Sequence, residues 1–206
     1  PLRMTNVPEL ADIRTLLDLL VSHGVDVQLA PERLENGCRT YTLHANNITS
    51  TTASYDLVRK MRASVLVLGP LLARFGQAKV SLPGGCAIGT RPVNLHLAGL
   101  RDLGAEIEIE DGYILAKAPN GGLKGGTVRF PSISVGATED LMMAAALTEA
   151  ETVLENAACE PEIVDLAKLL NTMGASIEGA GSSRMVIRGR NQLMGANHSE
   201  IGRAHV

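Results

Sequence analysis

Aromatic residues are scarce in this sequence: Trp is absent, and the 206 residues include only three Tyr and two Phe. Since 45% of the residues are nevertheless hydrophobic, the core has to consist of aliphatic side chains, alanine and methionine. The net charge is only −3 and no basic run exceeds two residues, which argues against a nucleic-acid-binding surface. No apolar run approaches the roughly 20 residues of a membrane-spanning helix, so we expect no membrane segment.

Cysteine is also scarce. Its three copies, Cys38, Cys86 and Cys159, are odd in number and widely spaced, which favours a reducing cytosol over a disulfide framework. No group of residues has the spacing of metal ligands. The glycine-rich segment 120–126 lacks the Gly-Lys-Ser/Thr ending of a phosphate loop. The sequence therefore predicts no metal site, and a hairpin turn rather than a phosphate loop at 120–126.

Internal repetition organises the chain. Segments 6–24 and 156–174 have the same length, and each begins with Asn, contains a Pro-Glu turn, places leucines at helical spacing and ends at Gly. A short alternating strand follows each of them. A third helix, ending at Gly104, is followed by the strand 105–110, a turn at Asp111-Gly112 and a second strand.

A second type of helix alternates with the first. Residues 55–75 and 138–150 are apolar on most faces, which is typical of buried helices, and a strand follows each. Pro70 predicts a kink or break near Gly69, because proline removes a helical hydrogen bond. The unit is therefore strand, buried helix, strand, amphipathic helix, strand, strand, repeated about three times, which predicts an α/β layered fold.

The most informative segment is 82–97, LPGGCAIGTRPVNLHL. Glycines around Cys86 let the backbone bend and let a ligand approach closely, and a thiol on such a loop can reach water. Arg91 supplies a planar set of donors that can hold an anion. The combination predicts acid–base or nucleophilic chemistry on an anionic substrate. The alternative is a glycine-rich hairpin with an inert cysteine and a solvated arginine.

This segment resembles the catalytic loop of the UDP-N-acetylglucosamine 1-carboxyvinyltransferases, the enolpyruvyl transferases that begin bacterial peptidoglycan synthesis. Segments 55–85, 132–147 and 155–175 also resemble that family, in its order, and the resemblance extends over residues 1–189. It implies an inside-out α/β barrel of the enolpyruvyl transferase type. Such a barrel has about three strand–helix–strand–helix–strand–strand repeats with central buried helices.

The resemblance also implies an activity. Enolpyruvate would move from phosphoenolpyruvate to the 3′-hydroxyl of UDP-N-acetylglucosamine with release of phosphate, in the bacterial cytoplasm and without a cofactor. Cys86 would be the general acid and the target of fosfomycin, and Arg91 would neutralise substrate charge. The shikimate-pathway enolpyruvyl transferases share the fold but lack the cysteine loop. A non-catalytic nucleotide-sugar-binding paralogue with an inert Cys86 is the alternative from another class.

The family's nucleotide-sugar contacts map to three places in this sequence. They are Arg62, the segment Arg91, Pro92, Val93, Asn94 and Leu95, and the segment Ser132, Ile133, Ser134 and Val135. Two of these positions depart from the family, since Asn94 stands where many members have Asp and Ser132 where several have Lys. We expect no charged contact from either.

Structural alternatives exist for these residues as well. Arg62 lies on an otherwise apolar helix, where an unpaired guanidinium would be costly, so it either meets an acidic partner or faces the cleft. Segment 132–135 precedes a helix start with Thr138 as the expected N-cap, and ordinary capping without a ligand is the alternative there. No role is assigned to His96, Glu160 or Glu162.

The expected domain organisation follows from the resemblance. We expect residues 1–200 to form one enolpyruvyl transferase domain with the cysteine loop, and residues 201–206 to be a non-native tail. The sequence begins at Pro1 without a methionine, and the family's second domain and its N-terminal Lys-Asn pair are not recognised. We therefore expect a fragment that is inactive alone. Its partners would be UDP-N-acetylglucosamine, phosphoenolpyruvate and the missing second domain.

Overall fold

The computed structural model describes residues 1–82, 93–120 and 122–201. The chain divides into two compact units: unit 1 is Pro1–Ser50 with Met194–Val206, and unit 2 is Thr51–Leu193. The described strands form three four-stranded sheets, one in unit 1 and two in unit 2, with helices between them along the chain. This confirms the α/β class. No helix within the described residues is long and apolar enough to span a membrane.

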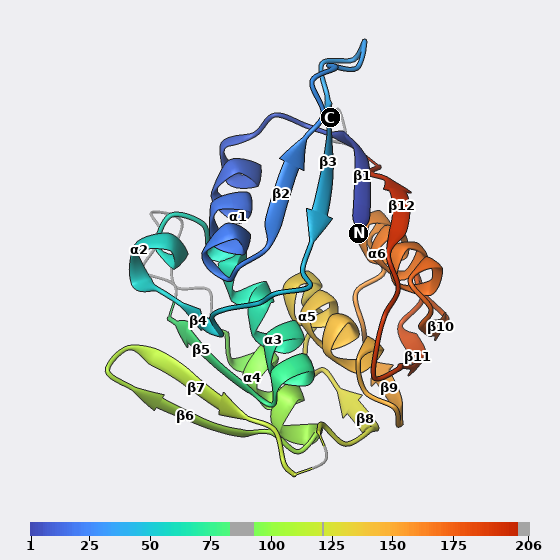
Figure 1. Cartoon of the computed structure of the whole chain (residues 1–206). Helices are drawn as coiled ribbons and strands as arrows, with labels where there is room; N and C mark the ends of the chain where they lie inside the picture. The colour runs from blue at the N-terminus through green and yellow to red at the C-terminus, as the bar shows by residue number, and fades with distance from the viewer. Residues whose placement is uncertain (83–92, 121, 202–206) are drawn as a thin grey trace. The chain divides into compact units, whose positions relative to one another are not determined.

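Unit 1 contains one sheet, with α1 packed beside β2 (Figure 1). Its elements are β1 (Leu2–Val7), α1 (Ala11–Ser22), β2 (Asp26–Leu29), β3 (Arg39–His44) and β12 (Ala196–Ser199). The strand order is β12-β1-β3-β2, and the β12–β1 pair is parallel whereas the other two pairs are antiparallel. The sequence pattern predicted α1 and β2 but gave no indication of β1, β3 or β12.

The first sheet of unit 2 has the order β4-β5-β7-β6. This part of the chain contains β4 (Thr52–Ala53), α2 (Tyr55–Val58), the 3-10 helix η1 (Arg62–Val67), α3 (Leu68–Phe75), β5 (Gln77–Ser81), α4 (Asn94–Asp102), β6 (Glu106–Glu110) and β7 (Tyr113–Lys117). The β4–β5 pair is parallel and the others are antiparallel. The turn between β6 and β7 has positive φ at Asp111 and Gly112, as the predicted hairpin requires.

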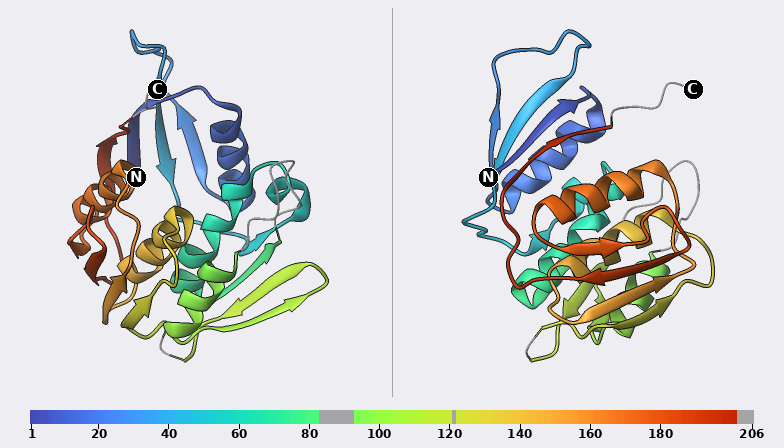
Figure 2. Two further views of the ribbon diagram at one scale, coloured as in Figure 1. Left: turned by 180° about the vertical axis from the view of Figure 1, so that it is seen from behind. Right: turned by 90° about the vertical axis from the view of Figure 1, so that its right-hand side faces the viewer.

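The second sheet of unit 2 has the order β10-β11-β9-β8. Its part of the chain contains β8 (Gly126–Arg129), α5 (Val135–Ala146), β9 (Glu151–Glu155), α6 (Pro161–Thr172), β10 (Ser176–Glu178) and β11 (Arg184–Arg188). The β8–β9 pair is parallel and the others are antiparallel. In the right-hand view of Figure 2, the orange helix α6 lies along the orange-red strands of this sheet.

The three sheets share one topology, a parallel pair at one edge followed by two antiparallel strands. The helices α1, α4 and α6 are followed by Gly24, Gly104 and Gly174, whose φ angles are 100°, 92° and 110°. A side chain is strained in this left-handed conformation, so glycine ends each helix. Asn6 and Asn156, at equivalent positions of two repeats, also have the same backbone conformation, with φ of 59° and 57°. The internal repetition predicted from the sequence is confirmed.

The apolar helices of unit 2 are buried, as predicted, and α5 has eight buried residues out of twelve. A methyl group built on Gly69 of α3 would lie 2.6 Å from the backbone oxygen of Asp140 and 3.2 Å from Cβ of Ala144. The helices α3 and α5 therefore approach so closely that only glycine fits between them.

The expectation of one helix over residues 55–75 is wrong, because this stretch divides into α2, η1 and α3. The predicted break near Gly69 lies between η1 and α3. Pro70 is the third residue of α3, where its missing N–H removes no intrahelical hydrogen bond.

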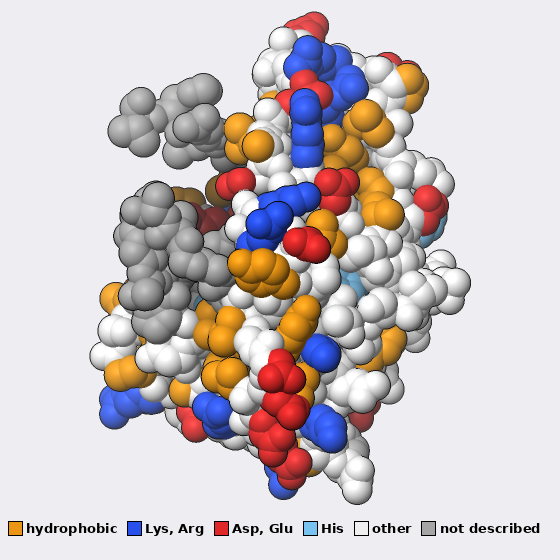
Figure 3. Space-filling view, turned by 90° about the vertical axis from the view of Figure 1, so that its left-hand side faces the viewer, with side chains coloured by type: hydrophobic (Ala, Val, Ile, Leu, Met, Phe, Trp, Pro, Cys, Tyr) orange, Lys and Arg blue, Asp and Glu red, His pale blue; other side chains and the backbone are white. Residues whose placement is uncertain are grey.

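The strand β6 lies at a sheet edge and carries a row of exposed glutamates, Glu106, Glu108 and Glu110. Acidic side chains form a column over the β6–β7 hairpin in Figure 3. Repeated charge on an edge strand opposes pairing with the strand of another molecule. Ile107 faces the other way and is buried.

Candidate functional site

The cysteine loop lies outside the described residues, and with it Cys86, Arg91 and Pro92. The backbone of Arg62 is described as the first residue of η1, but its side chain is not. The roles predicted for these four residues therefore stay predictions. The described part of the predicted site consists of the beginnings of α4 and α5.

The predicted segment at α4 forms the first turn of that helix. Val93 is the N-cap residue, with φ of −83° and ψ of 5°, and its side chain makes no capping hydrogen bond. Asn94 is exposed and Leu95 is partly exposed. All three residues directly follow the cysteine loop in the sequence.

The predicted segment at α5 leads into the first turn of that helix. Ser134 is the N-cap residue, and its Oγ accepts a hydrogen bond from the backbone N–H of Ala137 at 3.3 Å. Ser132 and Ile133 are exposed, and 61% of Ile133 is accessible to solvent. The first turn of a helix leaves backbone N–H groups without intrahelical partners and carries partial positive charge.

The expectation that Thr138 is the N-cap is wrong. Its hydroxyl is buried, donates a hydrogen bond to the backbone oxygen of Ser134 at 2.8 Å, and accepts one from the N–H of Ala158 at 3.1 Å. Thr138 therefore ties the first turn of α5 to the segment before α6. The N-cap of α5 is Ser134, four residues before the position that was expected from the acidic residues after Thr138.

A buried hydrogen-bond network joins α3, α4 and α5, and none of its residues was predicted to have a role. Asp140 of α5 is fully buried and His96 of α4 is 6% exposed. Nδ1 of His96 lies 3.1 Å from Oδ2 of Asp140, and Oδ1 of Asp140 accepts the backbone N–H of Gly69 at 2.8 Å. Burial raises the pKa of Asp140, while the hydrogen bond and the charge of His96 and the hydrogen bond from Gly69 oppose that rise.

The same imidazole brings the two predicted segments together. A methyl group built on Gly136, in the first turn of α5, would lie 3.4 Å from Cε1 and Nε2 of His96, which is in the first turn of α4. The helices α4 and α5 pack side by side in the centre of unit 2 (Figure 1). Segments 93–95 and 132–135 therefore lie at neighbouring helix starts.

Glu139 lies beside this network and is partly buried. Burial raises its pKa above the ordinary value of 4.5, and repulsion by Glu162 and Asp140 adds to the rise, whereas His96 opposes it. The pKa values of two carboxyl groups next to the start of α5 are thus raised, and burial is the largest cause for both.

Other parts of the described structure offer less support for a functional site than the starts of α4 and α5. No group of three or more His, Cys, Asp or Glu within the described residues is arranged to hold a metal ion. A polar depression lies at one end of the sheet that contains β8 and β9, where Arg129 pairs with Glu155 and Asn156 donates to the backbone oxygen of Phe130. It contains none of the residues that the sequence predicted.

Comparison with protein families identifies relatives of this chain. The model of the family described as EPSP synthase (3-phosphoshikimate 1-carboxyvinyltransferase) matches residues 2–202. A UDP-N-acetylglucosamine 1-carboxyvinyltransferase from Rhodospirillum centenum is 62% identical over 203 residues, which are 97% of this chain and 47% of that protein. One from Zymomonas mobilis is 57% identical over 197 residues, which are 96% of this chain and 46% of that protein. The chain spans about half the length of these relatives.

Solved structures share the fold. The enolpyruvyl transferase NikO from Streptomyces tendae matches with a TM-score of 0.80 at 22% identity, over 98% of this chain and 46% of that one. An EPSP synthase from Acinetobacter baumannii matches with a TM-score of 0.66 at 20% identity, over 96% and 43% respectively. The three repeats of unit 1 and unit 2 are thus those of the enolpyruvyl transferase fold, and the chain belongs to the EPSP synthase (3-phosphoshikimate 1-carboxyvinyltransferase) family.

Proposed function

We propose that the protein from which this chain derives transfers enolpyruvate from phosphoenolpyruvate to the 3′-hydroxyl of UDP-N-acetylglucosamine, releasing phosphate. The observation that supports this most is the identity of 57–62% over almost the whole chain to relatives named for that reaction. The reaction begins peptidoglycan synthesis, so the protein would act in the bacterial cytoplasm and contribute to cell-wall formation. Through the cell wall it would also contribute to cell shape and cell division.

In the proposed reaction the acceptor hydroxyl attacks C2 of phosphoenolpyruvate while the thiol of Cys86 protonates the methylene carbon. The tetrahedral adduct then loses phosphate from C2 and a proton from the methyl group, which restores the double bond. Arg91 balances the negative charge of the substrates during both steps. The reaction needs a thiol whose pKa is set by nearby cations, and fosfomycin would alkylate that thiol.

The nucleotide sugar would bind at the neighbouring starts of α4 and α5. Asn94 and Leu95 on one side and Ser132 to Val135 on the other are partly or fully exposed there. N–H groups in the first turn of α5 suit the oxygens of a phosphate or a uracil, and Arg62 would add a charged contact. Neither Asn94 nor Ser132 supplies charge, so affinity depends on the backbone and on the two arginines.

Calorimetric titration of the chain with UDP-N-acetylglucosamine tests this half of the site. The proposal predicts saturable binding that Arg62→Ala weakens at least about tenfold, which corresponds to about 1.4 kcal/mol. Arg14→Ala is the matched control, because Arg14 is an exposed arginine on α1 and should not affect binding. Binding that is the same in both variants would contradict the assigned site.

A non-catalytic nucleotide-sugar-binding protein is the second candidate. In such a protein the Cys86 thiol would have an ordinary pKa. The rate of thiol alkylation, measured as a function of pH, therefore distinguishes the two candidate functions. An enzyme should show a Cys86 alkylation rate whose pH profile is shifted from that of an ordinary thiol with a pKa of about 8.5. Cys159 is exposed and serves as the internal reference in the same chain. Equal pH profiles for the two thiols would favour the binding protein.

The remaining organisation of the protein follows from the same proposal. The active site would be completed by a second domain of the same polypeptide, and residues 1–200 would belong to one domain with 201–206 as a non-native tail. The chain alone would then not release phosphate from the two substrates. Detectable turnover by the purified 206-residue chain would contradict this division of the site.

A further inference from the structure

The first turn of α5 contains hydrogen-bond donors that the fold leaves unused. The N–H groups of Ala137 and Thr138 donate to the Oγ and the backbone oxygen of Ser134. Those of Val135 and Gly136, the first two residues of the helix, have no partner among the described residues. A helix of twelve residues also carries partial positive charge at this end. The start of α5 is therefore suited to an anion.

A buried imidazole lies at the same place. The side chain of His96 is 8% exposed, and a methyl group built on Gly136 would lie 3.4 Å from its Nε2. Nδ1 of this ring contacts Oδ2 of Asp140, whereas Nε2 has no hydrogen-bond partner among the described residues. An unpaired nitrogen on a ring buried to this extent costs free energy, and a ligand atom that bonds Nε2 would remove that cost. Because residue 136 is glycine, its own side chain does not cover Nε2.

The carboxyl group of Asp140 determines which ring nitrogen carries a proton. Its Oδ1 accepts the N–H of Gly69 at 2.8 Å, so Oδ2 is the oxygen left for Nδ1 of His96, 3.1 Å away. When the His96–Asp140 pair holds one proton, that proton lies between Oδ2 and Nδ1 and leaves Nε2 as an acceptor. When the pair holds two, one stays between these atoms and the other is on Nε2, which becomes a donor.

The two states of the pair differ in charge. With one proton the pair is negative and would repel an anion at the start of α5. With two protons it is neutral, and the N–H at Nε2 lies beside the unused N–H groups of the first turn. Burial raises the pKa of Asp140, which shifts the pair toward the second state. An anion at the start of α5 would shift it further in the same direction.

We propose that the His96–Asp140 pair makes anion binding at the start of α5 depend on a proton. The pair takes up one proton from the solvent, at Nε2, when a phosphate oxygen binds there and to the N–H groups of Val135 and Gly136. No other bond forms or breaks. Asp140 is a positioning residue, since it acts through His96. The identity of the phosphate, the diphosphate of UDP-N-acetylglucosamine, rests on the proposed function.

Other charged groups near the pair have to be distinguished from it. On α5, Glu139 interacts with His96 through charge, and Glu162 of α6 raises the pKa of Glu139. The helix α4 also packs on β6 and β8, and Asp140 contacts α3. The charged residues described on α3, α4, β6 and β8 are all exposed: Arg74, Arg101, Asp102, Glu106, Glu108, Glu110 and Arg129. Among the described residues, Glu139 is therefore the group that could take up the proton instead.

Calorimetric titration of the 206-residue chain with UDP-N-acetylglucosamine, in two buffers that differ in their heat of ionisation, measures the proton uptake. The nucleotide sugar is a diphosphate diester, so its phosphates exchange no proton near neutral pH. We expect an uptake of up to one proton for each ligand bound. The affinity should accordingly fall by up to about tenfold for each pH unit above neutral, because the proton is harder to obtain as the pH rises.

Asp140→Asn is the first variant. Its side-chain oxygen can still accept the N–H of Gly69 while its amide donates to Nδ1 of His96, so Nε2 carries a proton at every pH. The variant should therefore still bind the nucleotide sugar, but without proton uptake and with an affinity that no longer falls as the pH rises. A role of Asp140 in folding alone would not change the number of protons exchanged on binding.

Three further variants locate the proton. Gly136→Ala leaves the pair intact and places a methyl group against Nε2, so it should remove the uptake and weaken binding at least about tenfold. Glu139→Gln removes the competing carboxyl group and should keep the uptake. His44→Gln, at a partly exposed histidine of β3, is the matched control and should change neither uptake nor affinity.

Inorganic sulfate, which also exchanges no proton near neutral pH, separates this inference from the proposed function. The nitrogen NMR signal of Nε2 in His96 should change from that of an acceptor to that of an N–H group when sulfate binds, and should not change in Asp140→Asn. If this occurs but the nucleotide sugar does not bind, the proposed function fails and the inference stands.

The opposite result is also defined. Binding of the nucleotide sugar without proton uptake would overturn the inference and leave the proposed function standing. Uptake that survives Asp140→Asn or disappears in Glu139→Gln would overturn it as well, and so would an Nε2 signal that neither anion changes.

Discussion

At the scale of single residues, the carboxylate of Asp140 holds three helices together. It accepts the N–H of Gly69 from α3 and contacts the imidazole of His96 from α4, although it lies on α5 and is fully buried. Burying a carboxyl group costs free energy unless the group makes hydrogen bonds. Removing the group therefore destabilises the fold mainly because its buried hydrogen-bond partners are left unpaired. The network also fixes the first turn of α4, which follows the cysteine loop.

Asp140→Ala should lower the free energy of unfolding by about 3 kcal/mol, because it leaves the N–H of Gly69 and the buried imidazole without partners. Asp140→Asn retains an acceptor for Gly69 and should cost clearly less. Urea unfolding of the three proteins measures this. Equal losses in the two variants would show that charge, rather than the hydrogen bond to Gly69, is what matters.

Glu139 should make the free energy of unfolding depend on pH. Its pKa is raised in the folded state by burial and by Glu162, so the folded state keeps its proton to a higher pH than the unfolded chain does. The free energy of unfolding therefore falls as the pH rises through the raised pKa. Glu139→Gln should be more stable than the parent at pH 7–8, and this gain should vanish near pH 3, where Glu139 is protonated in both states.

Urea unfolding across that pH range measures the difference. Glu162→Gln should produce a smaller gain of the same sign, since it removes the repulsion but not the burial. A stability difference between Glu139→Gln and the parent that does not change with pH would contradict the assignment.

Sequence reasoning located segment 132–135 at a helix start but placed the cap at Thr138 rather than Ser134. Both are good capping residues, and only the backbone conformation distinguishes them. It also assigned no role to Asp140, although an acidic residue in an otherwise apolar helix is a visible signal. The sequence does not say which backbone N–H or imidazole will satisfy such a residue.

At the scale of elements, the contact between α3 and α5 depends on Gly69. A methyl group there would meet the backbone oxygen of Asp140 at 2.6 Å, and a backbone atom inside a buried helix cannot move aside as a side chain can. Gly69→Ala should therefore lower the free energy of unfolding by about 2–3 kcal/mol through overpacking.

Gly126→Ala is the matched control, because a methyl group there would have no neighbour nearer than 4.0 Å. It should change stability by less than about 0.5 kcal/mol. Thermal or urea unfolding of both variants measures the difference, and a harmless Gly69→Ala would mean that the two helices are further apart than described.

Elements with strong local patterns were predictable, and those that depend on distant partners were not. The amphipathic helices and the β6–β7 hairpin were found because their periodicity, glycine caps and turn residues are local. The strand β12 has only four residues and becomes a strand by pairing with β1, almost 200 residues earlier in the chain. Residues 55–75 were predicted as one helix because an apolar run does not show where the backbone changes from α to 3-10 geometry.

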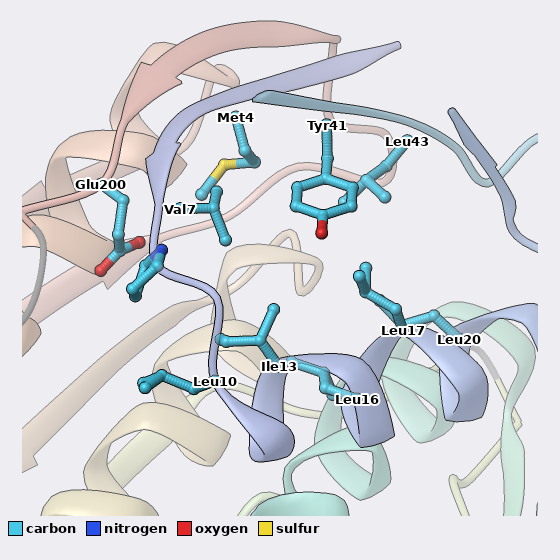
Figure 4. Close-up of a pocket in the computed structure, with 11 residues that line it drawn as sticks. Met4, Val7, Leu10, Ile13, Leu16, Leu17, Leu20, Tyr41, Leu43 and Glu200 are labelled. Carbon is cyan, nitrogen blue, oxygen red and sulfur yellow. The ribbon is translucent and has the colours of Figure 1, made fainter. Parts of the chain in front are cut away.

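At the scale of the whole molecule, the two units differ in how well their cores are filled. Unit 1 buries three hydrophobic residues among those described. An apolar cavity of about 380 Å³ stays open between its sheet and α1, where Met4 and Tyr41 lie opposite Ile13 and Leu17 (Figure 4). Local stability follows buried apolar contacts, so unit 1 should open more readily than unit 2. Backbone amides of β1 and β3 should exchange at least about tenfold faster than those of β9 and β11 under native conditions. Equal protection of the two sheets would contradict this.

The most direct test of the account is an activity measurement on the complete polypeptide that contains this chain. Phosphate release from phosphoenolpyruvate should occur with UDP-N-acetylglucosamine as acceptor and not with shikimate 3-phosphate. Cys86→Ala should abolish it, whereas Cys159→Ala should leave it within about twofold of the parent. Phosphate release that requires shikimate 3-phosphate, or that survives Cys86→Ala, would contradict the proposed function.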